Sequence, residues 1–119
     1  MRVQVLMWTC DPSNPNQHWI YNDHTSQVTI GGGGCLATDD SKEDGPGALV
    51  FVRDCEPGNP SQQWIYNANI KQIRKKDGRC LDASDRWSNG GLVHMVSCDP
   101  DNPNQQWDFN VGKDVCFYL

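Results

Sequence analysis

Three histidines are the side chains of this 119-residue chain best suited to acid–base chemistry: His18, His24 and His94. No Gly-x-Ser-x-Gly, His-Glu-x-x-His or paired-carboxylate spacing accompanies them. The glycine run at 31–34 is not followed by the Lys-Ser/Thr pair of a phosphate-binding loop, so a flexible turn is the simpler interpretation. The carboxylates fall in segments typical of solvated turns. We therefore expect no catalytic residues, no metal site and no cofactor.

Charge and hydropathy exclude two further classes of partner. The formal net charge is −5, whereas phosphate binding depends on clustered Lys and Arg, so we expect no nucleic-acid partner. The basic residues between 71 and 79 alternate with isoleucines and run into Asp77-Gly78, which is typical of a solvated strand and turn. The longest apolar runs, at 48–52 and 91–96, are too short to cross a bilayer.

The six cysteines indicate disulfides rather than a metal or redox site. Their number is even and no Cys-x-x-Cys pair occurs. Disulfides form in oxidising compartments, so we expect a secreted, extracellular protein. The first ten residues lack the apolar region of a signal peptide. A leader that has been removed, or a longer parent chain, would account for this.

An internal repeat organises the sequence. The pattern Cys-Asp/Glu-Pro-x-Asn-Pro-x-Gln-x-Trp occurs three times, beginning at Cys10, Cys55 and Cys98. A second element, Cys-Leu, occurs at Cys35 and again at Cys80. Three copies of a ten-residue pattern at nearly constant spacing do not arise by chance. The chain therefore contains three copies of one structural unit.

The sequence pattern of each unit predicts short strands and turns, with almost no α-helix. Apolar strands are predicted before each pattern, at 3–9, 48–53 and 92–97. The Pro-rich stretch is predicted to be a rigid loop, because proline fixes φ and removes a donor. Further strands are predicted after each Gln-x-Trp and at 28–30 and 70–73. One such unit cannot bury its apolar side, so three must share a core.

The triple Gln-x-Trp pattern with its preceding cysteines resembles ricin-type β-trefoil lectin domains over essentially the whole chain. The resemblance implies an all-β fold, a β-trefoil with three pseudo-symmetric repeats. It also implies that the repeated Trp lies in the core and that the Gln braces the backbone beside it. These structural roles fall on Trp19, Trp64, Trp107, Gln17, Gln62 and Gln105.

The chain ends depart from that family's order. We expect a single domain, 1–119, with repeat 2 at 31–74 and repeat 3 at 75–111. Repeat 1 occupies 1–30 and lacks its opening Cys-Leu-Asp strand. The tail 112–119 either closes the third repeat or replaces that missing strand, and both placements stay open. Either way the ends are atypically placed, and we expect the fold to lack one strand of the family's usual set.

The disulfide pairing also follows from the resemblance. In the family a disulfide joins the two cysteines within a repeat, which assigns Cys35–Cys55 and Cys80–Cys98. Cys10 and Cys116 remain, and we expect them to pair and tie the two chain ends together.

The family's sugar sites imply a candidate site in the third repeat. Such sites place an Asp after Cys-Leu, an aromatic shortly before the second Cys, and an Asn before the Gln. The third repeat has Asp82 and Asn104, with Asn104 next to Gln105. Met95 and Val96 fill the aromatic's position, so His94 or Trp87 would have to cover the sugar ring. In a purely structural alternative, Asp82 caps a turn, Asn104 braces the loop and Trp87 anchors its own loop.

The other two repeats match that pattern less well. The first has Trp8 and Asn16 but lacks the segment that should carry the Asp, for which Asp114 or another tail residue would have to substitute. In the second, Ala37 replaces the Asp, Ser61 replaces the Asn and Arg53 replaces the aromatic residue, so we expect no sugar site there.

The sequence thus predicts a carbohydrate-binding module, not an enzyme. Galactose and N-acetylgalactosamine are the sugars that the resemblance suggests, and glycoconjugates are the expected partners. The chain would act as a dimer or tethered within a larger protein. The alternative is a β-trefoil that binds proteins, as protease inhibitors do, without binding sugar.

Overall fold

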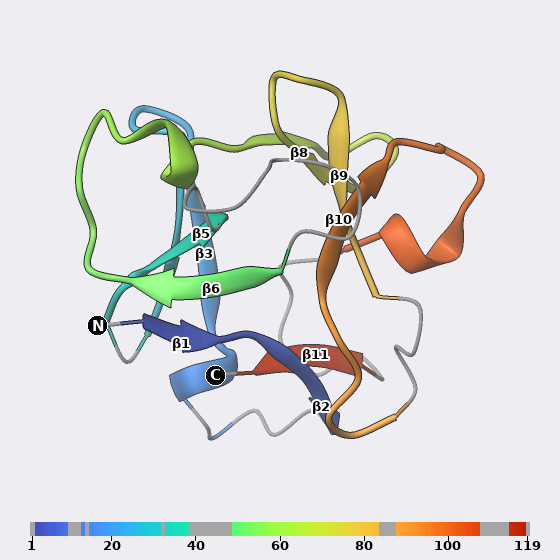
Figure 1. Cartoon of the computed structure of the whole chain (residues 1–119), viewed down its shortest axis with the longest axis horizontal. Helices are drawn as coiled ribbons and strands as arrows, with labels where there is room; N and C mark the ends of the chain where they lie inside the picture. Colours follow the sequence, from blue (N-terminus) through green and yellow to red (C-terminus); the bar gives the residue numbers. More distant parts are fainter. Residues whose placement is uncertain are drawn as a thin grey trace.

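The computed structural model describes residues 2–9, 13, 15–31, 33–38, 49–83, 88–107 and 115–118. Within these ranges the chain forms short strands and three single turns of 3-10 helix (Figure 1). All strand pairings are antiparallel. The architecture is the all-β fold that the repeat predicts.

The same elements recur along the chain in the predicted order. The first set is β1 (Arg2–Gln4), β2 (Leu6–Thr9), η1 (Pro15–Gln17), β3 (Trp19–Asn22) and β4 (Gln27–Ile30). The second is β5 (Cys35–Thr38), β6 (Val50–Arg53), η2 (Pro60–Gln62), β7 (Ile65–Asn67) and β8 (Gln72–Arg74). The third is β9 (Arg79–Asp82), β10 (His94–Ser97) and η3 (Pro103–Gln105), and β11 (Val115–Tyr118) follows.

The Pro-rich loop of each repeat contains a 3-10 turn, which the sequence interpretation missed. Proline occupies the first position of each turn, where its missing N–H costs nothing. In the second and third repeats an asparagine precedes it as N-cap. Asn59 Oδ1 accepts from the Ser61 backbone N–H at 3.0 Å, and Asn102 Oδ1 accepts from the Asn104 N–H at 2.9 Å. The Asn-Pro pair is therefore a cap and a helix start.

A ring of equivalent strand contacts joins the three repeats. The sheets have the orders β1-β6-β5-β4-β3, β10-β9-β8-β7 and β11-β2. Gln4 pairs with Phe51, Leu49 with His94, and Leu92 with Leu6. Each contact pairs residues of two different repeats. When the residues are counted back from the cysteine that follows each strand, all three contacts join the same two positions, so the repeats close around a pseudo-threefold axis. This closure is the β-trefoil arrangement.

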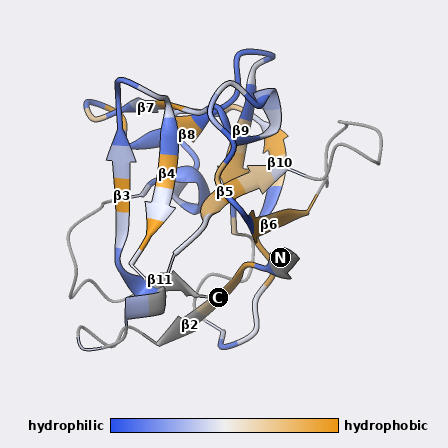
Figure 2. Ribbon diagram, turned by 90° about the vertical axis from the view of Figure 1, so that its left-hand side faces the viewer, coloured by the Kyte–Doolittle hydropathy of each residue, from blue (hydrophilic) through white to orange (hydrophobic). Residues whose placement is uncertain are grey.

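The core is built from the repeated tryptophans and the apolar strands. Trp64 is fully buried, and Trp107 and Trp19 are 4% and 7% exposed. The hydrophobic residues concentrate on the inner strands such as β5, β6 and β10, while the hairpin and loop surfaces are polar (Figure 2). The core role expected for the three tryptophans is confirmed.

Hydrogen bonds tie Trp64 and Trp107 each to their own repeat and to the one before. The indole N–H of Trp64 donates to the Leu36 carbonyl at 2.9 Å, and that of Trp107 donates to the Leu81 carbonyl at the same distance. The Tyr21 hydroxyl donates to the Trp64 carbonyl, and the Tyr66 hydroxyl to the Trp107 carbonyl, each at 3.0 Å. Adjacent repeats are therefore locked together at the Gln-x-Trp segment.

In the second and third repeats the glutamine two residues before the tryptophan closes the Pro-rich loop around its cysteine. In the second repeat, Gln62 Nε2 donates to the Asp54 carbonyl and Gln62 Oε1 accepts from the Glu56 N–H, both at 2.8 Å. These partners lie on either side of Cys55 in the chain. Gln62 is fully buried, and these bonds satisfy its side-chain amide away from water. The bracing role expected for this residue is confirmed.

The C-terminal strand β11 pairs with β2, at the lower edge of Figure 1. Cys116 lies opposite Trp8, as Cys80 lies opposite Val96 and Cys35 opposite Arg53. In this register β11 takes the place of the opening strand that the first repeat lacks. Cys10 lies outside the described residues, so its disulfide with Cys116 stays a prediction, as do the repeat boundaries.

Two disulfides link the opening strand of a repeat to the loop after its second strand. They are Cys35–Cys55 and Cys80–Cys98, as the family resemblance implied. Their sequence separations of 20 and 18 residues correspond to a stabilisation of about 3 kcal/mol each from restriction of the unfolded chain.

We therefore expect the Cys80→Ser/Cys98→Ser double variant to lose about 3 kcal/mol of unfolding free energy while keeping its fold. Urea denaturation of the parent and the variant under non-reducing conditions measures this difference. A midpoint unchanged from that of the parent would contradict the structural role of this bond.

Candidate functional site

The side chain of Asp82 is the centre of the candidate site. Asp82 ends strand β9, directly opposite His94 on β10. Its side chain is only 5% exposed, so a charged carboxylate there requires hydrogen-bond donors. His94 Nε2 lies 3.3 Å from Asp82 Oδ1, and Gln105 Nε2 donates to Asp82 Oδ2 at 3.1 Å. Asp82 is thus a strand residue held by two side chains, not a turn cap.

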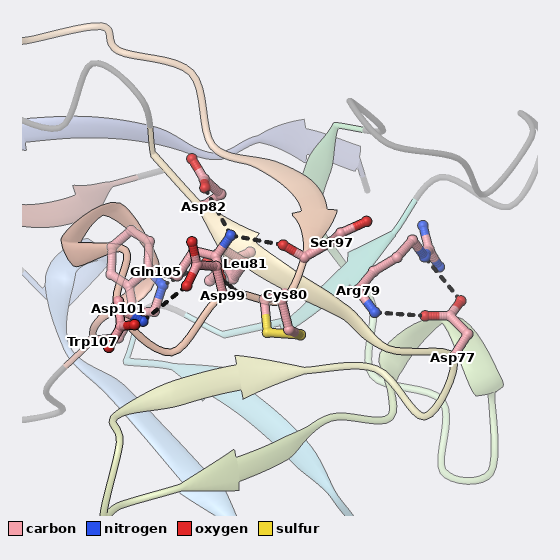
Figure 3. The surroundings of a disulfide bond; sticks show 11 residues. Asp77, Arg79, Cys80, Leu81, Asp82, Ser97, Asp99, Asp101, Gln105 and Trp107 are labelled. Atoms are coloured by element: carbon pink, nitrogen blue, oxygen red, sulfur yellow. Dashed lines mark hydrogen bonds and ion pairs between the residues drawn. A yellow bond between two sulfur atoms is a disulfide. The ribbon is translucent and has the colours of Figure 1, made fainter.

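Gln105 connects this carboxylate to the loop around Cys98 (Figure 3). Gln105 Nε2 also donates to the Ser97 carbonyl at 3.0 Å, and Gln105 Oε1 accepts from the Asp99 N–H at 2.8 Å. The backbone bonds repeat those of Gln62, and the bond to Asp82 is the addition. Gln105 is therefore both a structural brace and a fixed support for the carboxylate.

Asn104 lies next to the end of β9, beside the residue that follows Asp82. Its carbonyl accepts from the Ala83 N–H at 3.0 Å. The residue is half-buried, and within the described part of the chain its side-chain amide has no hydrogen-bond partner. The structure therefore brings together Asp82, His94, Asn104 and Gln105, four of the residues that the sequence singled out.

The residue that would stack against a sugar ring is less clearly placed. Met95 is fully buried in the core, so the family's aromatic position offers at most Val96, which is half-buried. His94 is 21% exposed at its side chain and lies on the outward side of β10. Trp87 lies outside the described residues. Among the described candidates, His94 is the ring nearest the carboxylate.

The second repeat has the same backbone arrangement but lacks the polar groups of the candidate site. Ala37 replaces the aspartate and is fully buried, and Phe51 replaces the histidine. Ser61 is 2% exposed, and its hydroxyl donates to Asn59 Oδ1 at 2.9 Å. The hydroxyl is thus used within its own loop. At the positions of Asp82 and Asn104, this repeat therefore has neither a carboxylate nor an amide.

The first repeat differs again, in a way that the sequence interpretation did not identify. Through the pairing of β11 with β2, Tyr118 lies opposite Leu6, at the register position that Asp82 holds in the third repeat. Counting two residues on from Cys116, as from Cys80, would have found it. The suggested substitute, Asp114, lies outside the described residues. Trp8 lies on β2 and Asn16 on η1, both described by their backbone alone.

The described residues also lack two other features, a metal-binding cluster and a membrane-spanning helix. They contain no group of three or more His, Cys, Asp or Glu side chains arranged to hold a metal ion. They also contain no helix long and apolar enough to span a membrane.

Comparison with known proteins identifies the family. The family model described as "Ricin-type beta-trefoil lectin domain" matches residues 2–64 and 28–116. The chain belongs to this family. It is a lectin domain, and domains of this family are carbohydrate-binding modules. The two overlapping matches agree with the internal repeat, because the second unit can align with either end of the family pattern.

A solved structure shares the fold of this lectin domain. The crystal structure of GalNAc-T7 with UDP, GalNAc and Mn2+ superposes with a TM-score of 0.72 at 23% sequence identity. The match covers 92% of this chain and 19% of that chain, so the lectin domain spans about a fifth of the larger protein. A comparison with curated proteins finds no match.

Proposed function

We propose that the domain binds glycans bearing galactose or N-acetylgalactosamine through the third repeat. The observation that carries this proposal is the Asp82 carboxylate, held by Gln105 and His94 beside the open amide of Asn104. The second repeat keeps the same backbone and the same bracing glutamine but has none of the other three groups. A purely structural role would not require them in one repeat alone.

The proposed chemistry is hydrogen bonding to two neighbouring sugar hydroxyls. An ionised carboxylate offers about four acceptor positions, and Gln105 and His94 engage one on each oxygen. A sugar hydroxyl would donate to a remaining position in a charge-assisted bond, which is about twice as strong as a neutral one. The Asn104 amide can donate and accept, which suits the second hydroxyl. Because Asp82 is already braced, little ordering would accompany binding.

The affinity of one such site is expected to be low. A shallow site with two polar contacts corresponds to a dissociation constant in the millimolar range, about −4 kcal/mol. Useful avidity then requires several domains or several glycans. We therefore propose that the domain acts as a dimer or as a tethered module of a larger protein. Its disulfides favour an oxidising, extracellular location.

A glycan array followed by calorimetric titration tests this proposal. We expect array hits restricted to terminal galactose and N-acetylgalactosamine, and saturable binding of lactose by the folded domain. Absence of any glycan hit, together with recovery of a specific protein ligand in a pull-down, would support a protein-binding trefoil and contradict the proposal.

A further inference from the structure

We propose that the side-chain amide of Gln105 alternates between two partners, the Asp82 carboxylate and the side-chain amide of Gln72, and that a bound glycan shifts it towards Gln72. Gln72 is then a positioning residue of the third-repeat site, contributed by the hairpin that β7 and β8 form in the second repeat. The exchange of partners is a property of the folded domain, whereas the effect of a glycan on it rests on the galactoside function proposed above.

The side chain of Gln72 carries a buried hydrogen-bond donor without an acceptor. Gln72 begins strand β8 and is 4% exposed. Its Nε2 atom is buried and has no hydrogen-bond partner within the described part of the chain. A buried donor without a partner is costly, and native proteins contain few of them. The domain therefore carries a cost at Gln72 that a new partner would remove.

The corresponding hairpin of the first repeat shows which partner lies within reach. Gln27 on β4 is the counterpart of Gln72, because each faces the asparagine that ends the other strand of its hairpin. Gln27 Nε2 donates to Gln62 Oε1 at 3.3 Å and so connects the first repeat to the second. Gln105 is the counterpart of Gln62 in the third repeat. The equivalent partner of Gln72 is therefore Gln105 Oε1.

The backbone contacts confirm that the two hairpins face the next repeat in the same way. The Trp64 N–H donates to the Ser26 carbonyl at 2.7 Å, and the Trp107 N–H donates to the Lys71 carbonyl at 2.8 Å. Ser26 and Lys71 directly precede the two hairpin glutamines, and both have a positive φ, of 61° and 60°. The hairpin of the second repeat thus presents its glutamine to the third repeat.

The amides of Gln62 and Gln105 differ in one hydrogen bond each. Both brace the loop around their cysteine through a backbone carbonyl and a backbone N–H. In addition Gln62 Oε1 accepts from Gln27, whereas Gln105 Nε2 donates to Asp82 Oδ2 at 3.1 Å (Figure 3). An amide oxygen has two acceptor positions, and among the described residues Gln105 Oε1 accepts only from the Asp99 N–H. Its second position can take the donor of the hairpin glutamine.

A glycan on the carboxylate would favour this exchange. A sugar hydroxyl that donates to Asp82 takes up part of its negative charge, so the attraction between Asp82 and the Gln105 amide weakens. The Gln105 amide can then adopt the arrangement of Gln62, in which its oxygen accepts from Gln72. Because the buried donor gains its partner in the bound state, the new bond adds to the affinity for the glycan.

A pair of matched variants tests the effect on binding. Gln72→Met removes the donor at similar volume, and calorimetric titration should show an affinity for lactose about fivefold below that of the parent, as for one neutral hydrogen bond. Its midpoint in urea should not fall, because the donor that is removed has no partner in the described part of the chain. Gln27→Met should do the reverse, with a lower midpoint through the lost bond to Gln62 and an unchanged affinity. A lower midpoint for Gln72→Met with unchanged affinity would show a purely structural residue and overturn the inference.

A second measurement needs no glycan and tests the exchange of partners alone. Asp82→Ala removes the carboxylate, so the Gln105 amide should adopt the arrangement of Gln62 and accept from Gln72. In spectra of the ¹⁵N-labelled domain, the side-chain amide signal of Gln72 should move towards that of Gln27, and its hydrogens should exchange with solvent more slowly than in the parent. An unchanged signal and exchange rate in the folded Asp82→Ala domain would contradict the exchange. Absence of lactose binding by the parent would instead contradict the galactoside proposal, so the two failures are distinguishable.

Discussion

Replacing Asp82 by alanine is expected to abolish most galactoside binding while leaving the domain folded. The variant removes the charged acceptor of the proposed site. Loss of one hydrogen bond to a charged group is worth roughly 1.5–3 kcal/mol, which is a large part of the total of about −4 kcal/mol for a millimolar site. Calorimetric titration with lactose should show at least a tenfold loss of affinity.

The second repeat shows why the fold should survive this change. Ala37 occupies the equivalent position there and is fully buried. Gln62 is satisfied by the Asp54 carbonyl without a carboxylate, and Gln105 would keep its bond to the Ser97 carbonyl in the same way. Asn104→Ala should silence binding similarly, whereas the matched Ser61→Ala variant should not affect it. Normal lactose binding by Asp82→Ala would show that the third repeat is not the site.

Trp64→Ala should strongly destabilise the domain. Trp64 is fully buried, and truncating a large core aromatic costs about 3–5 kcal/mol. The Leu36 carbonyl, which accepts from the indole, would also lose its partner, at about 1–3 kcal/mol. A domain of this size has roughly 5–15 kcal/mol of stability. We therefore expect the variant to lose a large part of the domain's stability.

The circular dichroism spectrum and the thermal transition of Trp64→Ala measure this effect. Ile20→Ala serves as the control, because Ile20 is a large apolar residue that is 63% exposed, and its substitution should leave the transition within a few degrees. A cooperative transition for Trp64→Ala near that of the parent would contradict the core role of the tryptophan.

The repeat made most of the fold predictable. The ten-residue pattern places a cysteine, a proline turn, a glutamine and a tryptophan at the same positions of each unit. All three units can therefore adopt the same local structure. The structure accordingly contains the expected disulfides at Cys35 and Cys80, buried tryptophans and closed ring. The 3-10 turns were missed because each is a single turn, too short for any hydrophobic period to reveal.

The candidate site was only partly predictable. Asp82, Asn104 and Gln105 follow from their places in the pattern, which is a local property of the sequence. The partnership of His94 with Asp82 and the place of Tyr118 depend on which residues face each other across strands. Strand register is set by tertiary pairing, and the chain closes its first repeat with a strand from far along the sequence. The local sequence pattern is for this reason compatible with two placements of that strand.

The most direct test of the galactoside site is chemical-shift mapping of the ¹⁵N-labelled domain during titration with lactose. We expect saturable shifts of the side-chain amides of Asn104 and Gln105 and of the backbone around Asp82 and His94. The Gln62 side-chain amide is the internal reference, because it has the same backbone partners without the carboxylate, and it should not move. Shifts centred on Ser61 and Gln62, or no saturable shift at Gln105, would contradict the account.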